Sequence, residues 1–149
     1  MTHLVTVRHN FETAHRLPHL PGKCTSLHGH SWWADVTIAA PELPPGGLVV
    51  EFGRLKKEFR AWVDEHLDHG AMLGAQDPLL PVLRAHGSKV YEVATWPTVE
   101  ATAELLAQVA GDILFDLPRA QYAHVSRVHV TETHVNGATW EQTPAEASA

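Results

Sequence analysis

The chain has 149 residues, a formal net charge of −6 at neutral pH, 44% hydrophobic residues and one cysteine. This length predicts a single domain, and the acidic balance excludes a general nucleic-acid-binding protein, which needs a basic face. A lone cysteine excludes an intrachain disulfide and fits a reducing cytosol. With no apolar signal core at the N-terminus and no apolar run of about 18 residues, we expect a cytoplasmic protein without a membrane partner.

The first part of the chain predicts two strands joined by a long loop. Apolar and polar residues alternate over residues 4–12, which indicates a strand. Residues 16–29 contain two prolines and two glycines and therefore predict a loop. Residues 30–40 are a β-favouring run that predicts the second strand, and residues 48–52 are short and extended.

Two helices, with irregular structure between them, are predicted for the middle of the chain. Apolar side chains recur at helical spacing in residues 54–67, and charged side chains occupy the other face. A second helix is expected to begin at Thr98, which is a favourable N-cap. Residues 68–96 are interrupted by glycines and prolines and predict irregular structure.

The last part predicts two more strands, at residues 122–134 and 138–141, because Asn136-Gly137 between them is a strong hairpin signal. The order ββααββ predicts an α+β fold, an antiparallel sheet with two helices on one face. Residues 1–142 would form this domain, and residues 143–149 a disordered tail.

The strongest local signal for chemistry is His28-Gly29-His30, within a chain that holds 12 histidines. Residues two apart on an extended chain point to the same side, and the glycine between them allows a close approach to the backbone. If the first two strands pair as a hairpin, His15 comes alongside both histidines. Three imidazoles with an open fourth position are typical of a catalytic zinc site. An isolated His-x-His would instead be two solvated loop residues.

Cys24 lies four residues before His28, inside the long loop. A lone cysteine is usually a small buried hydrophobe, but this polar stretch is a poor core position. Adjacent Lys23 and a nearby zinc would both favour the thiolate. Such a thiolate could act as a base on a carbon acid or as a nucleophile, and the residues alone leave both roles open.

Two further acidic residues complete the candidate set. Asp68 precedes His69, and a carboxylate beside an imidazole can fix its tautomer, although many helices simply end in charged residues. Glu132 lies on a β-branched strand and would share a face with Val130, where a carboxylate needs a partner. A guanidine-like edge, as on a pterin ring, offers a carboxylate two parallel N–H donors. Alternatively, Glu132 lies at a subunit contact or faces solvent.

Together these motifs resemble the 6-pyruvoyltetrahydropterin synthase superfamily, in the family's order and over about residues 5–142. The matching motifs are Phe11-Glu12-Thr13-Ala14-His15-Arg16-Leu17-Pro18, Cys24-x-x-x-His28-Gly29-His30, Leu67-Asp68-His69, Pro97-Thr98-x-Glu100 and Glu132-Thr133. The three-residue gap between Cys24 and His28 is similar to the carboxytetrahydropterin branch, which serves queuosine biosynthesis.

The resemblance implies a zinc-dependent lyase that converts dihydroneopterin triphosphate to 6-carboxytetrahydropterin, acetaldehyde and triphosphate. It implies three zinc ligands, His15, His28 and His30. It implies four catalytic residues: Cys24 as the proton-abstracting base, Asp68 and His69 as its relay, and Glu132. It implies that substrate is bound by Glu132, which anchors the pterin ring, and by Thr133.

The resemblance also implies the tunnelling fold, in which subunits join their sheets into barrels, with active sites at subunit contacts and a homohexamer as the assembly. Two alternatives remain: a pyruvoyltetrahydropterin synthase or related pterin-cleaving enzyme, and a catalytically silent zinc- and pterin-binding module. The chain departs from the family pattern at Glu51, at Met72-Leu73, and in a longer stretch over residues 74–96. This stretch could line or cover the site.

Overall fold

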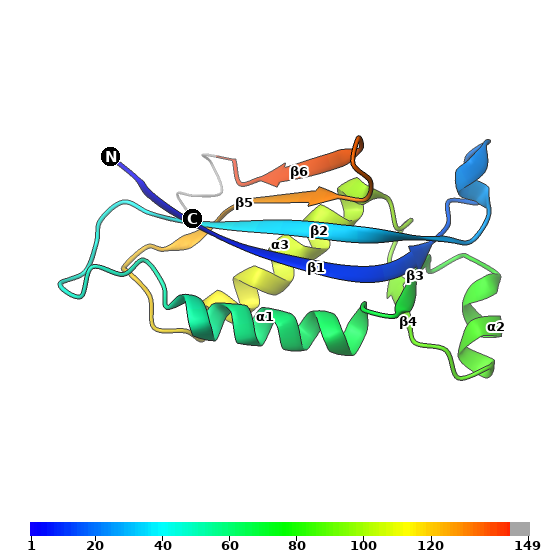
Figure 1. The fold of residues 1–149 in the computed structure, drawn as a ribbon, viewed down its shortest axis with the longest axis horizontal. Coiled ribbons are helices and arrows are strands. Elements are labelled where there is room, and N and C mark those ends of the chain that lie inside the picture. The colour runs from blue at the N-terminus through cyan, green and yellow to red at the C-terminus, as the bar shows by residue number, and fades with distance from the viewer. Residues whose placement is uncertain (144–149) are drawn as a thin grey trace.

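The computed structural model describes residues 1–143 and contains one six-stranded sheet with the strand order β4-β3-β1-β2-β5-β6 (Figure 1). The strands are β1 (His3–His15), β2 (His28–Ala40), β3 (Gly70–Gly74), β4 (Val90–Val93), β5 (His124–Thr131) and β6 (Gly137–Glu141). The helices are α1 (Phe52–His66), α2 (Leu79–Ala85) and α3 (Val99–Phe115), and a 3-10 turn covers Lys23–Thr25. Except for its first residue, the predicted tail lies outside the described part of the chain.

The long hairpin of β1 and β2 positions the candidate site. Its antiparallel register pairs His3 with Ala40 and His15 with His28. From Val7 to His15, every second side chain of β1 is buried, so the alternation seen in the sequence is the alternation of a sheet with one covered face. Directly opposite residues share a face, so His15 and His28 lie on the covered side. The predicted hairpin is confirmed.

Two helices, α1 and α3, pack against one another and contribute to the same core as β1, β2 and β5. In α1 the buried residues are those of the predicted apolar face, Leu55, Phe59 and Val63. The N-cap prediction for α3 is confirmed, because the Thr98 Oγ1 atom accepts a hydrogen bond from the Ala101 N–H at 3.1 Å. Burial of each large core side chain contributes roughly 1.5–3 kcal/mol, so this shared face holds the helices on the sheet.

The prediction of irregular structure for residues 68–96 is wrong. Strands β3 and β4 and helix α2 lie in this segment, and the sheet is mixed because β3 runs parallel to both β1 and β4. The sequence Gly70–Gly74 is short and bounded by glycines, so it carries no alternation that would predict a strand. Its extended conformation comes from pairing with the edge of β1, which no local pattern records.

The predicted strand 122–134 ends earlier, at Thr131. The N–H groups of Glu132 and Thr133 both donate to the Asn136 carbonyl, and this turn leads into β6 at the predicted Asn136-Gly137 position. Glu132 therefore lies just past the end of β5, where the chain leaves the sheet. Among the helices within residues 1–143, none combines the length and apolarity that crossing a membrane requires.

Candidate metal and substrate site

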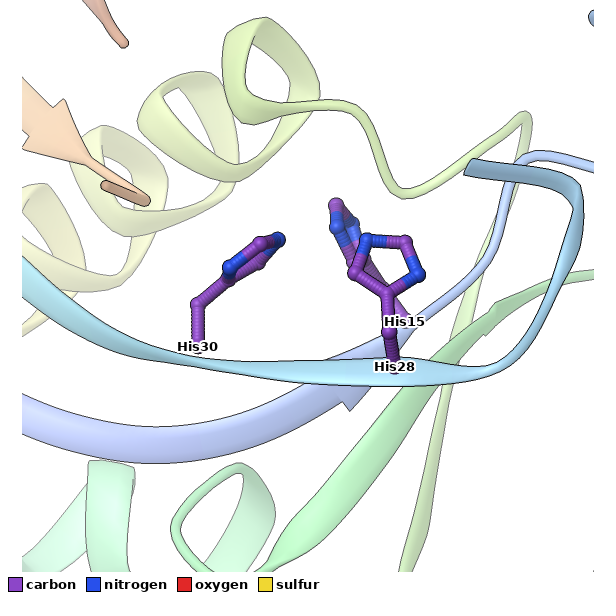
Figure 2. A group of neighbouring side chains, drawn as sticks. All are labelled: His15, His28 and His30. Atoms are coloured by element: carbon purple, nitrogen blue, oxygen red, sulfur yellow. The ribbon is translucent and has the colours of Figure 1, made fainter. Parts of the chain in front are cut away.

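Three histidines converge on the covered face of the hairpin (Figure 2). His15 comes from the end of β1, and His28 and His30 come from the start of β2. Their ring centroids are 4.7 Å apart for His15 and His28, 5.1 Å for His15 and His30, and 4.8 Å for His28 and His30. One ring nitrogen from each lies within 4.8 Å of the other two. The structure therefore brings together the three predicted metal ligands.

The local structure fixes the tautomer of His15. Its Nδ1 atom lies 2.7 Å from the backbone carbonyl oxygen of Pro97. A carbonyl oxygen only accepts, so Nδ1 donates and the lone pair is on Nε2. Nε2 is buried and has no hydrogen-bond partner within residues 1–143. Burial lowers the pKa of His15 to about 4; neighbouring His28 and His30 add to this, while the Pro97 contact opposes it. His15 is therefore neutral at neutral pH.

His28 is held in the same manner as His15. The His28 Nδ1 atom donates to the Ser26 carbonyl oxygen at 2.6 Å, which leaves its Nε2 lone pair available. Burial lowers the pKa of His30, although the nearby Glu132 carboxylate opposes the shift. Trp32 is fully buried beside the centre, with its ring 4.9 Å from that of His15, and its indole N–H donates to the Thr13 carbonyl.

This donor set fits a metal ion. Metal ligation requires neutral imidazoles with a free nitrogen, and carbonyl partners on the other nitrogen are the usual way in which proteins orient such ligands. A buried ring nitrogen without a hydrogen bond, as on His15, has a cost that a bound cation removes. Three imidazoles and an open side are the ligands typical of catalytic zinc.

Glu132 lies directly beside this centre. Its Oε2 atom is 3.6 Å from Nε2 of His15 and 3.9 Å from Nε2 of His30, and its side chain is only 17% exposed. The structure thus answers the question of what partner this carboxylate has: it faces the histidines rather than open solvent. Because His15 is neutral, the contact is not a strong ion pair, and the carboxylate keeps the capacity to accept hydrogen bonds from a ligand.

An open cavity of about 670 Å³ adjoins Glu132 and His30. Its lining residues come from β1, β2 and the chain at the end of β5: Arg8, Gly29, His30, Ser31, Trp33, Thr131, Glu132, Thr133 and His134. The Thr133 hydroxyl oxygen accepts from the backbone N–H groups of Val135 and Asn136, so its own hydrogen remains as a donor. Both predicted substrate-binding residues therefore line one cavity.

Cys24 lies in the 3-10 turn of the loop that joins β1 and β2, and it is exposed. Its carbonyl oxygen accepts from the Leu17 N–H at 2.7 Å, so the two ends of the loop are tied together just after His15. The thiol is therefore open to solvent, and the Cys24 backbone is linked to His15 through Leu17 and to His28 through three intervening residues.

Asp68 and His69 form a pair, as predicted. The Nδ1 atom of His69 lies 2.7 Å from Asp68 Oδ2, and Asp68 Oδ1 accepts from the Glu12 N–H at 2.8 Å. Burial raises the pKa of Asp68, but these hydrogen bonds and nearby Arg60 outweigh it, so the pKa lies below its usual value. The ring of His69 is 79% exposed. None of the interactions found within residues 1–143 joins this pair to Cys24 or to the histidine centre.

Two contributors to the site were not predicted. Trp32 follows His30 at the same two-residue spacing, so strand periodicity could have placed it beside the histidines. The Pro97 carbonyl could not have been found, because a backbone oxygen has no residue-type signal and it lies 82 residues from His15.

The match to known proteins covers almost the entire described chain. A family model described as 6-pyruvoyl tetrahydropterin synthase matches residues 4–143. The chain is 34% identical over 130 residues to the 6-carboxy-5,6,7,8-tetrahydropterin synthase of Rickettsia bellii, covering 86% of this chain and 92% of that protein. It is 39% identical over 83 residues to the protein of the same name from Synechocystis sp., covering 51% of this chain and 64% of that protein.

Solved structures share the fold. An uncharacterized protein from Wolinella succinogenes matches with a TM-score of 0.79 at 22% identity, over 96% of this chain and 99% of that chain. A mutant of the 6-pyruvoyltetrahydropterin synthase of Plasmodium vivax matches with a TM-score of 0.72 at 18% identity, over 95% and 98%. These likenesses confirm the predicted α+β tunnelling fold of the chain. With the family model matched over residues 4–143, this chain belongs to the 6-pyruvoyl tetrahydropterin synthase family.

Proposed function

We propose that this protein is a zinc-dependent carbon–carbon lyase that converts 7,8-dihydroneopterin triphosphate and water to 6-carboxy-5,6,7,8-tetrahydropterin, acetaldehyde and triphosphate. The observation that carries the proposal is the convergence of His15, His28 and His30 beside the Glu132 carboxylate at an open cavity. The names of the relatives from Rickettsia bellii and Synechocystis sp. support the same activity.

His15, His28 and His30 would hold the zinc ion through their free ring nitrogens. When bound, zinc supplies Lewis-acid polarisation to the side-chain hydroxyls of the substrate, which makes the neighbouring carbon more acidic. The carbonyls of Pro97 and Ser26 orient two of the three rings before the metal arrives. The site is therefore organised by the fold as well as by the ion.

Glu132 would orient the substrate. A pterin ring presents adjacent N–H donors along one edge, and a carboxylate accepts two parallel hydrogen bonds from such an edge. Glu132 is mostly buried beside the cavity, where a hydrogen bond to a charged acceptor is stronger than in water. Thr133, at the same cavity, has one hydroxyl hydrogen left to donate to the ring or to its substituents.

Cys24 would remove the proton from the side chain of the substrate, and Asp68 and His69 would relay it. Asp68 holds the Nδ1 proton of His69, so Nε2 of that ring can accept a proton. In one subunit this exposed pair makes its contacts with Glu12 and Arg60, away from the histidines. We infer that a homohexamer completes the site, with Asp68 and His69 reaching Cys24 across a subunit contact.

The second candidate is formation of 6-pyruvoyltetrahydropterin, the activity that names the family. The three-residue gap between Cys24 and His28 favours the carboxytetrahydropterin reaction, as do the relatives above. The product would then serve queuosine or another 7-deazapurine pathway in the cytoplasm.

The deciding experiment is mass spectrometry of the products that the zinc-loaded protein forms from dihydroneopterin triphosphate. A 6-carboxypterin together with acetaldehyde is the expected result. Pyruvoyltetrahydropterin as the product would overturn the proposal in favour of the second candidate. Tight binding of zinc and pterin without any turnover would identify a catalytically silent module.

A further inference from the structure

The loop that carries Cys24, residues 16–27, contacts the segment of residues 74–98. Figure 1 shows the 3-10 turn of this loop and helix α2 at the same end of the sheet. The resemblance to the family implies that residues 74–96 are longer than in its compact members, and the structure shows what this segment contacts. Three of its residues contact His15, Arg16 and His19.

The central contact is a buried, bidentate ion pair between Arg16 and Asp77. The Arg16 Nε atom donates to Asp77 Oδ2 at 2.8 Å, and a terminal guanidinium nitrogen donates to Asp77 Oδ1. The Asp77 side chain is fully buried, whereas that of Arg16 is 21% exposed. Asp77 Oδ1 also accepts from the Leu79 N–H at 2.8 Å, which holds the carboxylate at the start of α2.

Arg16 stabilises the charged form of Asp77. The Arg16 hydrogen bonds are the largest influence on the pKa of Asp77 and hold it below its usual value, although burial opposes them. A buried carboxylate is stable as an anion only when paired and hydrogen-bonded. The pair therefore has one well-defined geometry, which fixes the backbone of Arg16 next to the ligand His15.

Two neighbouring contacts fasten the same stretch. The Pro97 carbonyl orients the His15 ring, and the Trp96 ring stacks on His19 with centroids 4.4 Å apart and planes 14° from parallel. Gly74 permits this arrangement, because a Cβ atom there would lie 2.5 Å from the Thr95 carbonyl oxygen and 2.7 Å from the Trp96 ring.

A backbone hydrogen bond connects the Arg16 region to Cys24. The Leu17 N–H donates to the Cys24 carbonyl oxygen at 2.7 Å, and Leu17 directly follows Arg16. A shift of Arg16 therefore moves His15 on one side and the Cys24 turn on the other. Catalytic groups need placement to within fractions of an ångström, so such a shift affects both metal binding and turnover.

We propose that Asp77 is a positioning residue, which acts through Arg16 to set the orientation of His15 and the place of the Cys24 loop. The metal part of this inference rests on the proposed function, whereas the anchoring of the loop does not. An ion pair that served stability alone would leave the loop and the metal affinity unchanged when it is replaced by uncharged residues of similar size.

The test compares Asp77→Asn, Arg16→Met and the double variant with Glu92→Gln as a matched control. Glu92 pairs with Arg84 at 3.5 Å on the same segment, but both side chains are about half exposed. Zinc affinity is measured by competition with a chelator. Loop anchoring is measured in the metal-free protein as the rate of tryptic cleavage after Lys23, which is exposed within the loop. Thermal unfolding is followed in parallel.

We expect Asp77→Asn and Arg16→Met each to lower zinc affinity and to speed cleavage after Lys23 by about tenfold or more, while Glu92→Gln changes neither. The double variant, which leaves no unpaired buried charge, should recover thermal stability but keep both defects. If either single variant does not fold, the double variant supplies the same test, because it leaves neither charge without its partner.

Wild-type zinc affinity and wild-type cleavage in Arg16→Met or in the double variant would overturn the inference and leave a purely stabilising ion pair. If the wild-type protein itself binds no zinc, the proposed function fails, and the cleavage rates still decide whether Asp77 anchors the loop.

Discussion

The Oε2 atom of Glu132 lies 3.6 Å from Nε2 of the buried His15, so residues from opposite ends of the chain meet at one centre. The low pKa of His15 keeps that ring neutral, and the carboxylate is therefore not neutralised by it. The Glu132 carboxylate lies beside three histidines that could hold a metal ion and lines an open cavity. It can therefore accept hydrogen bonds from a ligand in that cavity. This relationship makes Glu132 the most informative residue to change.

The first prediction concerns Glu132→Gln. If the carboxylate accepts hydrogen bonds from the N–H groups at the edge of the pterin ring, glutamine removes the negative charge. Its amide also points an N–H donor at the N–H donors of the ring. We expect normal folding and zinc content, with substrate binding or turnover reduced by orders of magnitude, measured by steady-state kinetics. Glu141→Gln on β6 is the control and should behave as wild type. Near-normal kinetics would show that Glu132 is structural, and loss of zinc would show that it is a metal ligand instead.

The second prediction concerns the metal. The purified protein should carry about one zinc ion per chain, because three histidines with an open side form one catalytic site. His28→Ala should remove zinc and activity together, as measured by elemental analysis and product formation. His86→Ala, which changes an exposed histidine outside the centre, serves as the control. Full zinc occupancy in His28→Ala would refute the assignment.

The third prediction concerns Cys24. If its thiolate is the base, Cys24→Ala should leave a folded protein that binds zinc and pterin normally. Turnover should fall roughly 10²–10⁴-fold, the usual contribution of a positioned acid–base group. The native thiol should also be protected from alkylation by bound substrate. Ser26→Ala, in the same loop, keeps the carbonyl that orients His28 and should retain activity. Wild-type turnover in Cys24→Ala would remove the thiol from the mechanism.

The fourth prediction concerns His9, which is 7% exposed and packs 4.9 Å from the Phe59 ring. Burial, followed by Arg60 and Lys56, lowers the pKa of His9 below the usual histidine value of about 6.5. Below that pH the unfolded chain binds a proton that the folded chain lacks. The free energy of unfolding should therefore fall as the pH drops from about 6.5 toward the folded pKa.

His9→Phe removes this titration at similar volume. Urea unfolding of the metal-free proteins at about pH 7.5 and about pH 5.5 measures the effect, and the variant should lose less stability between the two values. His15 titrates in the same direction in both proteins and cancels in the comparison. Equal losses in wild type and variant would show that His9 does not contribute to the pH dependence.

The sequence predicted the hairpin and the three histidines that converge on it. Alternation along β1 and the spacing of His28 and His30 are local patterns, and strands that follow one another in the sequence usually pair. The N-cap at Thr98 is local as well, because its hydroxyl bonds to a group three residues away. These features depend on neighbours in the chain, which is why sequence patterns record them.

Only the tertiary structure decided which distant groups complete the centre. Glu132 reaches His15 because β5 pairs with β2, and Pro97 and Asp77 reach His15 and Arg16 because β3 adds to β1 in parallel. Parallel pairing and contacts to backbone carbonyls leave no periodic trace in the sequence, since they depend on how whole elements pack. The same packing places Asp68 in contact with Glu12 and Arg60.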